Sequence, residues 1–430
     1  MTADITTARR RSNSGWRRAL APRSAGVVYA LVALVVILTI TSSAQGRPSY
    51  LSSVNVSNIL DQSSLIGILA IFMTVVLITG NFDLSVASTA ALAGTVVLKL
   101  IDQHGAVIAL LAALLTGALV GLINGLLVQK VGVNAFIVTL GTLTAVRGVV
   151  QAILNGQSIT ANDSVFQRFE TARWTMPTGV AIALGIVLLG AGLGLTLRRR
   201  PRQLTAGNVM LLSAGAVALA LGAFRPLLLD ETAPVWIMLA LTVLTSLVLR
   251  YTVVGRNLYA VGGNPEAARL SGINIDRYKM GAFVLNGLVA GAVGVLYAGK
   301  FNSVDPTVLT GGELTVIAAA VLGGTSLFGG SGYVAKSVVG TLILFTLSNG
   351  FNVLNIGSNY QNVVQGGVLV AAASLYTATS TRGRGFIAAK FARGRKVAAP
   401  TESTDAGPAG RSATPSGSTD QPMASVSPRN

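Results

Sequence analysis

Long runs of apolar residues, separated by short polar segments, dominate the chain between residues 26 and 378. A helix needs about 20 apolar residues to cross the hydrocarbon core of a bilayer, and about twelve runs approach that length. They occupy residues 26–43, 62–79, 83–101, 105–128, 133–154, 178–197, 206–224, 233–250, 278–298, 312–327, 333–354 and 361–378. Glycines interrupt the runs at 82–101 and 311–330, which predicts short or broken helices there. The pattern as a whole predicts an all-α, polytopic bundle of membrane helices.

Composition excludes a soluble enzyme, a DNA-binding regulator and a secreted scaffold. Of the 430 residues, 51% are hydrophobic and 11% are charged, whereas soluble domains carry about 25% charged residues. The mean hydropathy is +0.65. The sequence has no cysteine and a single histidine, His104, so it offers no disulfide framework and no thiolate ligand. We therefore expect this chain to contain no catalytic residue and to bind no metal and no cofactor.

The net charge of +17 is interpreted as a signal of membrane orientation and not of nucleic-acid binding. Most Lys and Arg fall in alternate loops and in both tails, and the acids favour the other loops. Basic loops stay in the cytoplasm. The sequence thus predicts a plasma-membrane protein with both ends inside. Its parts are a basic tail at 1–25, a transmembrane domain at 26–378, and a tail at 379–430 that is basic and then disordered.

Two distant segments of the chain resemble each other. Residues 83–95 match residues 313–325 without a gap at about half of their positions, and each copy is followed by a run that contains Asn-Gly. An odd number of predicted spans separates the copies, so they should run in opposite directions. Inverted repeats are typical of transporters, with the substrate route where the copies meet. The runs at 178–224 fall between the copies and predict an inserted hairpin that is peripheral to the route.

Polar residues of the two copies, with one arginine, are the candidates for a substrate route or a gate: Asp83, Ser85, Asn124, Arg147, Glu313, Thr315 and Asn349. Asp83 and Glu313 begin spans, where an acid also caps a helix or complements its dipole. Asn124 and Asn349 lie inside spans, where interhelical hydrogen bonding is the alternative. Arg147 lies about 10 Å from a span end, so its alternative role is to reach the membrane surface.

The longest predicted cytoplasmic loop, 251–279, contains a short helix with signals at both ends. Its residues are Asn264, Pro265, Glu266, Ala267, Ala268 and, after the helix, Gly272. Asn suits the N-cap, Pro the first helical position, and Gly the position after the end. A helix of two turns is marginal on its own. It therefore either packs against its own protein or docks into a groove of a cytoplasmic partner.

This loop resembles the coupling segment of bacterial ABC importer permeases, which centres on Glu-Ala-Ala followed by Gly. The wider chain is similar to the ribose- and xylose-type sugar permeases. The similarity lies at 80–86, 121–125, 135–142, 255–257, 263–273 and 323–330. Phe82 and Ala135 stand where that family usually has Ile and Pro. The basic hairpin at 198–202 resembles the longer, xylose-type members.

The resemblance implies the permease subunit of an ABC importer that translocates a monosaccharide, xylose or a related pentose. It implies two cytoplasmic ATPase subunits that bind ATP and magnesium, an extracytoplasmic sugar-binding protein, and a second permease copy in a homodimer surrounded by lipid. The glycines at 329–332 do not form a phosphate-binding loop, because no Gly-Lys-Ser/Thr follows them. They predict a tight turn and close packing instead.

Other cargoes stay open, namely branched-chain amino acids, a signal sugar or a nucleoside. A secondary transporter driven by an ion gradient is the alternative from a different class. Such proteins usually carry ionisable groups deep in the bundle. In this chain the sequence places only Arg147 well inside a span and no acid, which argues against ion coupling.

Overall fold

The computed structural model describes residues 22–162, 172–198 and 230–357, with a few further positions at 168, within 212–223 and within 360–370. The chain divides into two units, Met1–Tyr376 and Thr377–Asn430. All of the described residues belong to the first unit. Both predicted tails, and most of the predicted spans at 206–224 and 361–378, lie outside the described residues.

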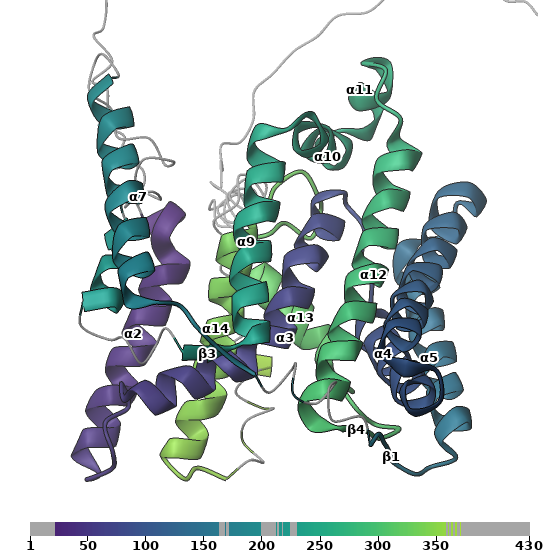
Figure 1. Ribbon diagram of the computed structural model, residues 1–430. Coiled ribbons are helices and arrows are strands. Elements are labelled where there is room, and N and C mark those ends of the chain that lie inside the picture. The colour runs from purple at the N-terminus through teal and green to yellow at the C-terminus, as the bar shows by residue number, and fades with distance from the viewer. Residues whose placement is uncertain are drawn as a thin grey trace, which may run out of the picture. The chain divides into compact units, whose positions relative to one another are not determined.

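Helices make up almost all of the regular structure in the first unit (Figure 1). They are α2 (Pro22–Ala44), α3 (Ser53–Ile78), α4 (Val86–Leu126), a π-helical turn (Leu127–Val131), α5 (Ala135–Leu154), α7 (Thr178–Arg198), α9 (Ala233–Tyr251), α10 (Val253–Gly263), α11 (Pro265–Leu270), α12 (Ile275–Phe301), α13 (Gly312–Leu322) and α14 (Val334–Val353). Within the described residues, eight helices are long and apolar enough to span a membrane. The predicted polytopic all-α fold is confirmed.

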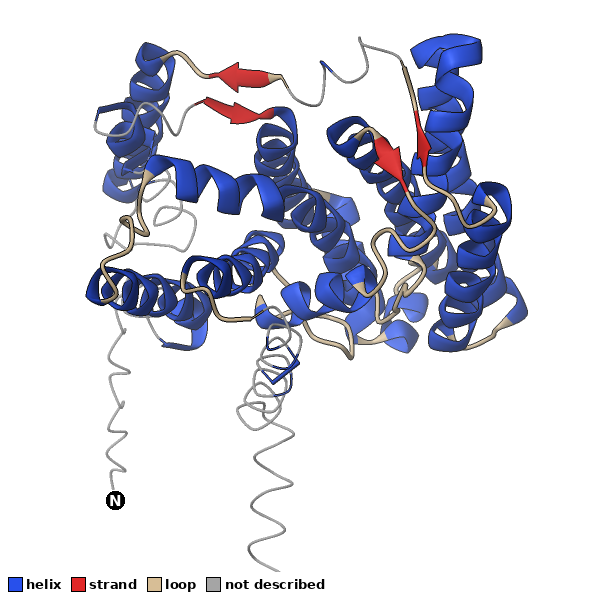
Figure 2. Cartoon of the chain, turned by 90° about the horizontal axis from the view of Figure 1, so that it is seen from below, coloured by secondary structure: helices blue, strands red, loops and turns tan. Residues whose placement is uncertain are grey.

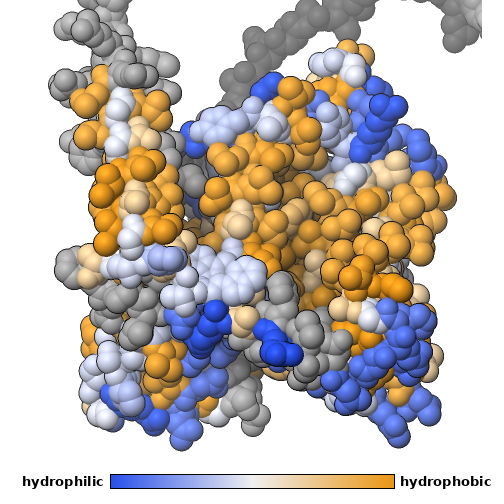
Figure 3. Space-filling view, in the orientation of Figure 1, coloured by the Kyte–Doolittle hydropathy of each residue, from blue (hydrophilic) through white to orange (hydrophobic). Residues whose placement is uncertain are grey.

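A broad apolar surface separates two more polar ends of the bundle (Figure 3). In Figure 1, α10 and α11 lie at the top, strands β1 (Ile159–Thr160) and β4 (Ser303–Val304) lie at the bottom, and β3 (Asp230–Thr232) lies above them in the lower half. We call these the α11 end and the strand end. The middle zone is the part that a bilayer would cover, because its exposed Leu, Ile and Val side chains are more stable in contact with lipid than with water.

The strands form two short antiparallel sheets, which Figure 2 shows as separate pairs of red arrows. β1 pairs with β4, so that Ile159 lies opposite Val304. β2 (Arg173–Thr175) pairs with β3, so that Trp174 lies opposite Glu231. The first sheet ties the segment after α5 to the end of α12, and the second ties the segment before α7 to the start of α9.

Helix α3 is the centre of the bundle. Of its most apolar stretch, 83% is buried, against 28% for α5 and for α9. The sequence predicted this span to start at residue 62, but the helix begins nine residues earlier. Polar residues such as Asn55, Ser57 and Asp61 fill its first turns, so apolar content alone missed them. Asn55 and Ser57 find partners on other elements in the fold.

Helix α4 is a hairpin of two arms that meet at Gly105, whose φ of 76° and ψ of 166° are not helical. Residues 86–104 form the first arm and residues 106–126 the second. Asp83 just before the first arm contacts Asn286 of α12, and Ala90 contacts Gly294, so this arm runs parallel to α12. The predicted break between two spans at 101–105 is therefore confirmed.

The second arm of α4 runs antiparallel to α12. A Cβ atom at Gly291 would lie 2.8 Å from the Ala113 carbonyl oxygen, and one at Gly287 would overlap the carbonyl oxygen of Gly117. Backbones come this close only where the facing residues are small, as glycine and alanine are. Glycine on α12 thus lets that helix fit against both arms of the hairpin.

Each long helix that precedes a repeat copy packs against the other copy. Helix α3 precedes α4 but packs against α13 and α14, and α12 precedes α13 but packs against α4. Gly312 at the start of α13 lies near Ile66 in the middle of α3, and Thr74 near the end of α3 contacts Ser337 after α13. Helix α13 therefore runs in the direction of α3, whereas the first arm of α4 runs in the direction of α12.

The two copies run in opposite directions, as the repeat predicts, because α3 and α12 are themselves antiparallel. Lys300 at the end of α12 forms an ion pair with Asp61 near the start of α3, with 2.7 Å between Nζ and Oδ2. The copies also meet near the middle of the bundle. A Cβ atom at Gly312 would lie 3.5 Å from Cβ of Ala87.

Candidate functional site

A chain of buried polar side chains surrounds the start of the first repeat copy. Ser85 Oγ donates a hydrogen bond of 2.6 Å to Asp83 Oδ1, and Asn124 Nδ2 donates one of 2.9 Å to Ser85 Oγ. Thr142 Oγ1 on α5 then donates to Asn124 Oδ1 over 2.7 Å. On the other side, Asn286 Nδ2 on α12 donates to Asp83 Oδ2 over 2.8 Å. We call these five residues the Asp83 network.

The Asp83 network joins the turn before α4, the second arm of α4, α5 and α12. Asp83 is 1% exposed, Asn124 is 0% exposed and Asn286 is 1% exposed. The sequence left Asp83 between a capping role and a route or gate. A capping role alone does not describe Asp83, because its carboxylate also accepts a hydrogen bond from Asn286 on α12, 203 residues away in the chain. Interhelical hydrogen bonding by Asn124, the alternative that the sequence left open, is what the structure shows.

Two members of this network were missed from the sequence, Asn286 and Thr142. Asn286 is followed by Gly287, so α12 contains the same Asn-Gly pair that marked Asn124 and Asn349. A search for every Asn-Gly inside an apolar run would have found it. Thr142 carries no comparable signal, because a hydroxyl in a membrane helix usually bonds its own backbone, as Thr142 also does to Val138.

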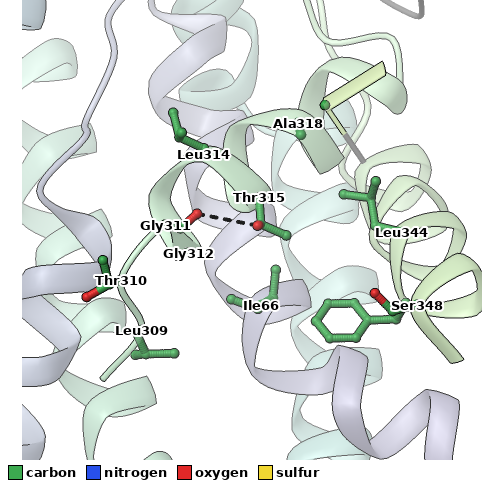
Figure 4. A pocket seen from close by; sticks show the side chains of 12 residues that line it. Ile66, Leu309, Thr310, Gly311, Gly312, Leu314, Thr315, Ala318, Leu344 and Ser348 are labelled. Carbon is green, nitrogen blue, oxygen red and sulfur yellow. Dashed lines mark hydrogen bonds between the residues drawn. The ribbon is translucent and has the colours of Figure 1, made fainter. Parts of the chain in front are cut away.

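The second repeat copy begins beside a cavity of about 530 Å³ (Figure 4). Its lining residues from α3, α13, α14 and the segment before α13 are Ile66, Leu309, Thr310, Gly311, Gly312, Leu314, Thr315, Ala318, Leu344, Phe345 and Ser348, and Gly366, which follows α14 in the chain, completes the described wall. The predicted route residue Thr315 lies in this wall, where its hydroxyl donates to the Gly311 carbonyl over 3.4 Å. The lining mixes apolar side chains with three hydroxyl groups and carries no charged side chain among the described residues.

Arg147 and Glu313 lie next to the cavity wall in the chain or in space, but neither belongs to its lining. Arg147 Nη1 donates to the carbonyl of Val308 over 2.6 Å, so α5 holds the segment that leads into α13. Glu313 lies in the first turn of α13, as dipole complementarity predicts, and its charge acts on the Arg147 guanidinium. Its Oε2 atom is buried and has no hydrogen-bond partner in the described part of the chain.

Asn349 on α14 is the repeat counterpart of Asn124, and it too bonds between helices. Its Nδ2 atom donates to Asn55 Oδ1 on α3 over 2.9 Å. The copies differ beyond this point. Asn124 belongs to the same network as Asp83 and Ser85, whereas the structure places Asn349 with α3 and gives it no described bond to Glu313 or Thr315.

The predicted coupling helix forms with both of its expected ends. Asn264 Oδ1 accepts the Ala267 backbone N–H over 3.0 Å, and Pro265 is the first residue of α11. Gly272 has a φ of 79°. Its N–H donates to the Arg269 carbonyl and that of Ile273 to the Ala268 carbonyl, both over 3.0 Å. This is the paired bond pattern of a glycine-terminated helix. Ala268 is buried, and α11 lies apart from the Asp83 network at one end of the bundle (Figure 1).

A second buried acid lies at the strand end. Glu231 is 2% exposed, its Oε2 accepts from Ser57 Oγ over 2.9 Å, and its Oε1 has no partner among the described residues. Burial raises the pKa of Glu231 above its ordinary value, and the charges of Asp61 and Asp230 act in the same direction. The Ser57 hydrogen bond and Arg173 act against that rise. This acid fastens the start of α9 to α3.

The described residues of the inserted segment pack against one another. A Cβ atom at Gly185 on α7 would lie 2.7 Å from Cγ of Leu219, and one at Gly192 would lie 2.9 Å from Cγ of Leu212. Trp236 on α9 donates from Nε1 to the Trp174 carbonyl over 2.8 Å, beside the β2–β3 sheet. None of the residues of the Asp83 network or of the cavity wall comes from α7. In the described part of the chain, no group of three His, Asp or Glu side chains is placed to hold a metal.

A family model described as branched-chain amino acid transport system / permease component matches residues 55–373. The ribose import permease protein RbsC of Escherichia coli K12 is 34% identical over 343 residues, which cover 80% of this chain and 91% of that protein. The xylose transport system permease protein XylH of the same strain is 33% identical over 369 residues, covering 83% and 92%. XylH of Haemophilus influenzae is also 33% identical, covering 83% and 97%. No solved structure matches the chain.

Proposed function

The chain belongs to the family of branched-chain amino acid transport system permease components, and from that premise we propose that it imports a pentose, xylose or a close relative. Family membership makes it a multi-pass transport subunit and not an enzyme. Its relatives of 31–34% identity are named as ribose and xylose permeases, which supports a monosaccharide as cargo.

The observation that carries the choice of a sugar is the lining of the cavity beside α13. Its volume lies within the range of about 300–1,000 Å³ that is typical of small-molecule sites. Three hydroxyl groups, of Thr310, Thr315 and Ser348, and the backbone of three glycines lie there among apolar side chains. A sugar matches hydroxyl groups and apolar patches, whereas the ammonium and carboxylate of an amino acid favour charged partners.

Xylose is our choice over ribose on two counts. The alignments with the xylose permeases extend over 369 and 366 residues, against 343 and 342 for the ribose permeases. The inserted hairpin around 198–202 also resembles the longer, xylose-type members. The second repeat copy, with Thr315 and Glu313, would then form one wall of the route, and the Asp83 network would hold the helices that move as it opens.

The energy for transport comes, in this proposal, from cytoplasmic ATPase subunits that dock on α11. A capped helix of six residues at a polar end of the bundle supports that assignment, and it makes the α11 end cytoplasmic. An extracytoplasmic sugar-binding protein would deliver the cargo at the strand end, and two copies of the chain would form the complete permease. ATP and magnesium would be bound by the ATPase subunits.

The decisive experiment is uptake into liposomes that contain the chain, a candidate ATPase and a candidate sugar-binding protein from the same organism. We expect labelled xylose to accumulate only with ATP on the ATPase side, and ribose or leucine to accumulate more slowly. Ionophores should not reduce uptake. Accumulation that needs an ion gradient and no ATP would refute the proposal in favour of a secondary transporter. Preference for leucine would refute the sugar assignment alone.

Orientation can be tested separately, because the chain has no cysteine of its own. Leu270→Cys and Gln157→Cys place single thiols at exposed positions of the α11 end and the strand end. In intact cells a membrane-impermeant maleimide should label the second variant and not the first. The reverse pattern would turn the protein around in the membrane.

A further inference from the structure

Two large apolar side chains at the α11 end are exposed to an unusual degree. Leu270 at the end of α11 is 85% exposed, and Phe328 in the loop between α13 and α14 is 79% exposed. These are the highest values among the large apolar side chains of the described residues. Neither residue lies in a helix long enough to span a membrane. Contact with lipid along a membrane span therefore does not explain why these two side chains are exposed.

The loop that carries Phe328 comprises residues 323–333, and we call it the glycine loop. It is held by hydrogen bonds to the end of α3 and to α10, the helix directly before α11 in the chain. The Gly330 N–H donates to the Ile78 carbonyl over 2.9 Å, and Tyr259 Oη on α10 donates to the Gly332 carbonyl over 2.8 Å. A Cβ atom at Gly330 would lie 2.6 Å from Cα of Gly263. Gly263 immediately precedes the cap of α11, so the loop and the helix share one support.

The shape of the glycine loop holds Phe328 outward. Ser326 Oγ accepts the Phe328 N–H over 3.1 Å, and the Ser326 N–H donates to the Ser331 carbonyl over 2.9 Å. Gly329 and Gly330 have φ angles of 83° and 72°, a region that residues with a side chain rarely enter. The exposed phenyl ring is thus a fixed feature of the turn, and not the end of a loose segment.

The glycine loop also continues directly from α13, whose first turns line the cavity. At the far end of α13, a Cβ atom at Gly323 would lie 2.5 Å from the Ser337 backbone nitrogen, so α13 and α14 touch there through their backbones. Helix α13 has eleven residues, about 16 Å at 1.5 Å per residue. A displacement of Phe328 would therefore reach Thr315 through one short, stiff element.

The charges around these two side chains define the kind of surface that fits them. Arg256, Arg269 and Arg277 are exposed on α10, α11 and the start of α12, whereas Glu266 is the one acid of α10 and α11. The other acid close by, Asp276, forms an ion pair of 3.1 Å with Lys130. A complementary surface would carry carboxylates around an apolar pocket.

We propose that the glycine loop is a second docking element for the cytoplasmic ATPase, with Phe328 as its apolar anchor, and that it passes the movement of the ATPase to α13. The inference rests on the proposed function, because it assigns the same partner to a second contact. Helix α11 and Phe328 together form one interface that combines apolar anchors with a basic rim. The partner surface is acidic around a pocket that receives the phenyl ring.

The test compares full-length Phe328→Ala with Phe136→Ala in complexes with the candidate ATPase. Phe136 is a matched control, since it is 51% exposed but lies on α5, a helix that can span the membrane. We expect Phe328→Ala to weaken ATPase binding by more than about tenfold, as truncation of an interface anchor does. Phe136→Ala should change it by less than about twofold. Phe328→Trp should keep most of the affinity.

Two further readouts separate this inference from the proposed function. Phe328→Cys should cross-link to the ATPase in the assembled complex, and the xylose carried per ATP hydrolysed should fall in Phe328→Ala. If the parent chain binds the ATPase and transports xylose while Phe328→Ala does both equally well, the inference is wrong and the proposed function stands. Failure of the parent chain to bind any ATPase would overturn both. An effect of Phe328→Ala on membrane association alone would make the ring a lipid anchor and overturn the inference.

Discussion

The Asp83 network allows two substitutions of equal burial to be ranked before they are made. Asn286→Leu removes the one described donor to Asp83 Oδ2, because the other bonds to this carboxylate, from Ser85 N and Oγ, reach Oδ1. A buried acceptor left without a donor costs about 1–3 kcal/mol, and more when it is charged. We therefore expect Asn286→Leu to lower the free energy of unfolding by about 3 kcal/mol.

Asn124→Leu serves as the comparison, because it also removes a buried asparagine from a helix. Both of its partners keep another bond, since Ser85 Oγ still donates to Asp83 and Thr142 Oγ1 still donates to the Val138 carbonyl. Interhelical hydrogen bonds in membranes average about 0.6 kcal/mol, so the loss of two amounts to about 1 kcal/mol. Asn286→Leu should thus be clearly the more destabilising of the two.

The background variant Asp83→Asn tests the reason for this order. Asn286 Oδ1 is buried without a partner in the described residues, so a half-turn of the Asn286 amide lets that oxygen accept from the new amide group. Asp83→Asn should therefore shift stability by less than about 1 kcal/mol. In this background Asn286→Leu leaves a neutral group unpaired in place of a carboxylate, and its effect should shrink.

The assay is the thermal unfolding midpoint of the purified variants in one detergent, with the four proteins and the double variant measured side by side. The expected order of midpoints is parent and Asp83→Asn highest, Asn124→Leu lower, and Asn286→Leu lowest. If Asn286→Leu unfolds at the same temperature as Asn124→Leu, the carboxylate does not depend on α12. The account of Asp83 as a buried acceptor would then be wrong.

Three further predictions use other parts of the bundle. Gly117→Ala should lower the free energy of unfolding by about 2 kcal/mol or more, because the new Cβ would overlap a carbonyl of the facing helix α12. Gly141→Ala is the control: no atom lies within 4 Å of its Cβ, so the thermal midpoint should be unchanged or slightly higher. Asn264→Ala removes the cap of α11, worth about 1 kcal/mol, and should lower transport per ATP without changing the amount of protein in the membrane; unchanged transport would contradict the docking role. Burial raises the pKa of Glu231 above 4.5, so its protonated form favours the fold, and that stability should be lost as pH rises through the raised pKa. Glu231→Gln should remove this part of the pH dependence, and equal pH profiles for the two proteins would refute it.

Properties that depend on neighbours in the chain could be predicted from the sequence. The apolar runs gave the membrane class and most of the helices, because burial in lipid demands a continuous apolar stretch. Helix α11 was predicted with both ends, since the Asn264 cap and the Gly272 stop act within a few residues. The break at Gly105 and the tight turn at Gly329 were predicted for the same reason.

The sequence by itself thus determined the membrane class and the apolar helices of the described residues, while the tertiary structure decided what those helices meet. Nothing local places Asn286 against Asp83, or the two arms of α4 against the glycines of α12. The repeat gave the opposite directions of the two copies, but not that each packs on the helix preceding the other. The cavity at Thr315 likewise needs walls from three helices. These features arise because hydrogen bonds and close backbone contacts form between groups that are near in space but far apart in the sequence.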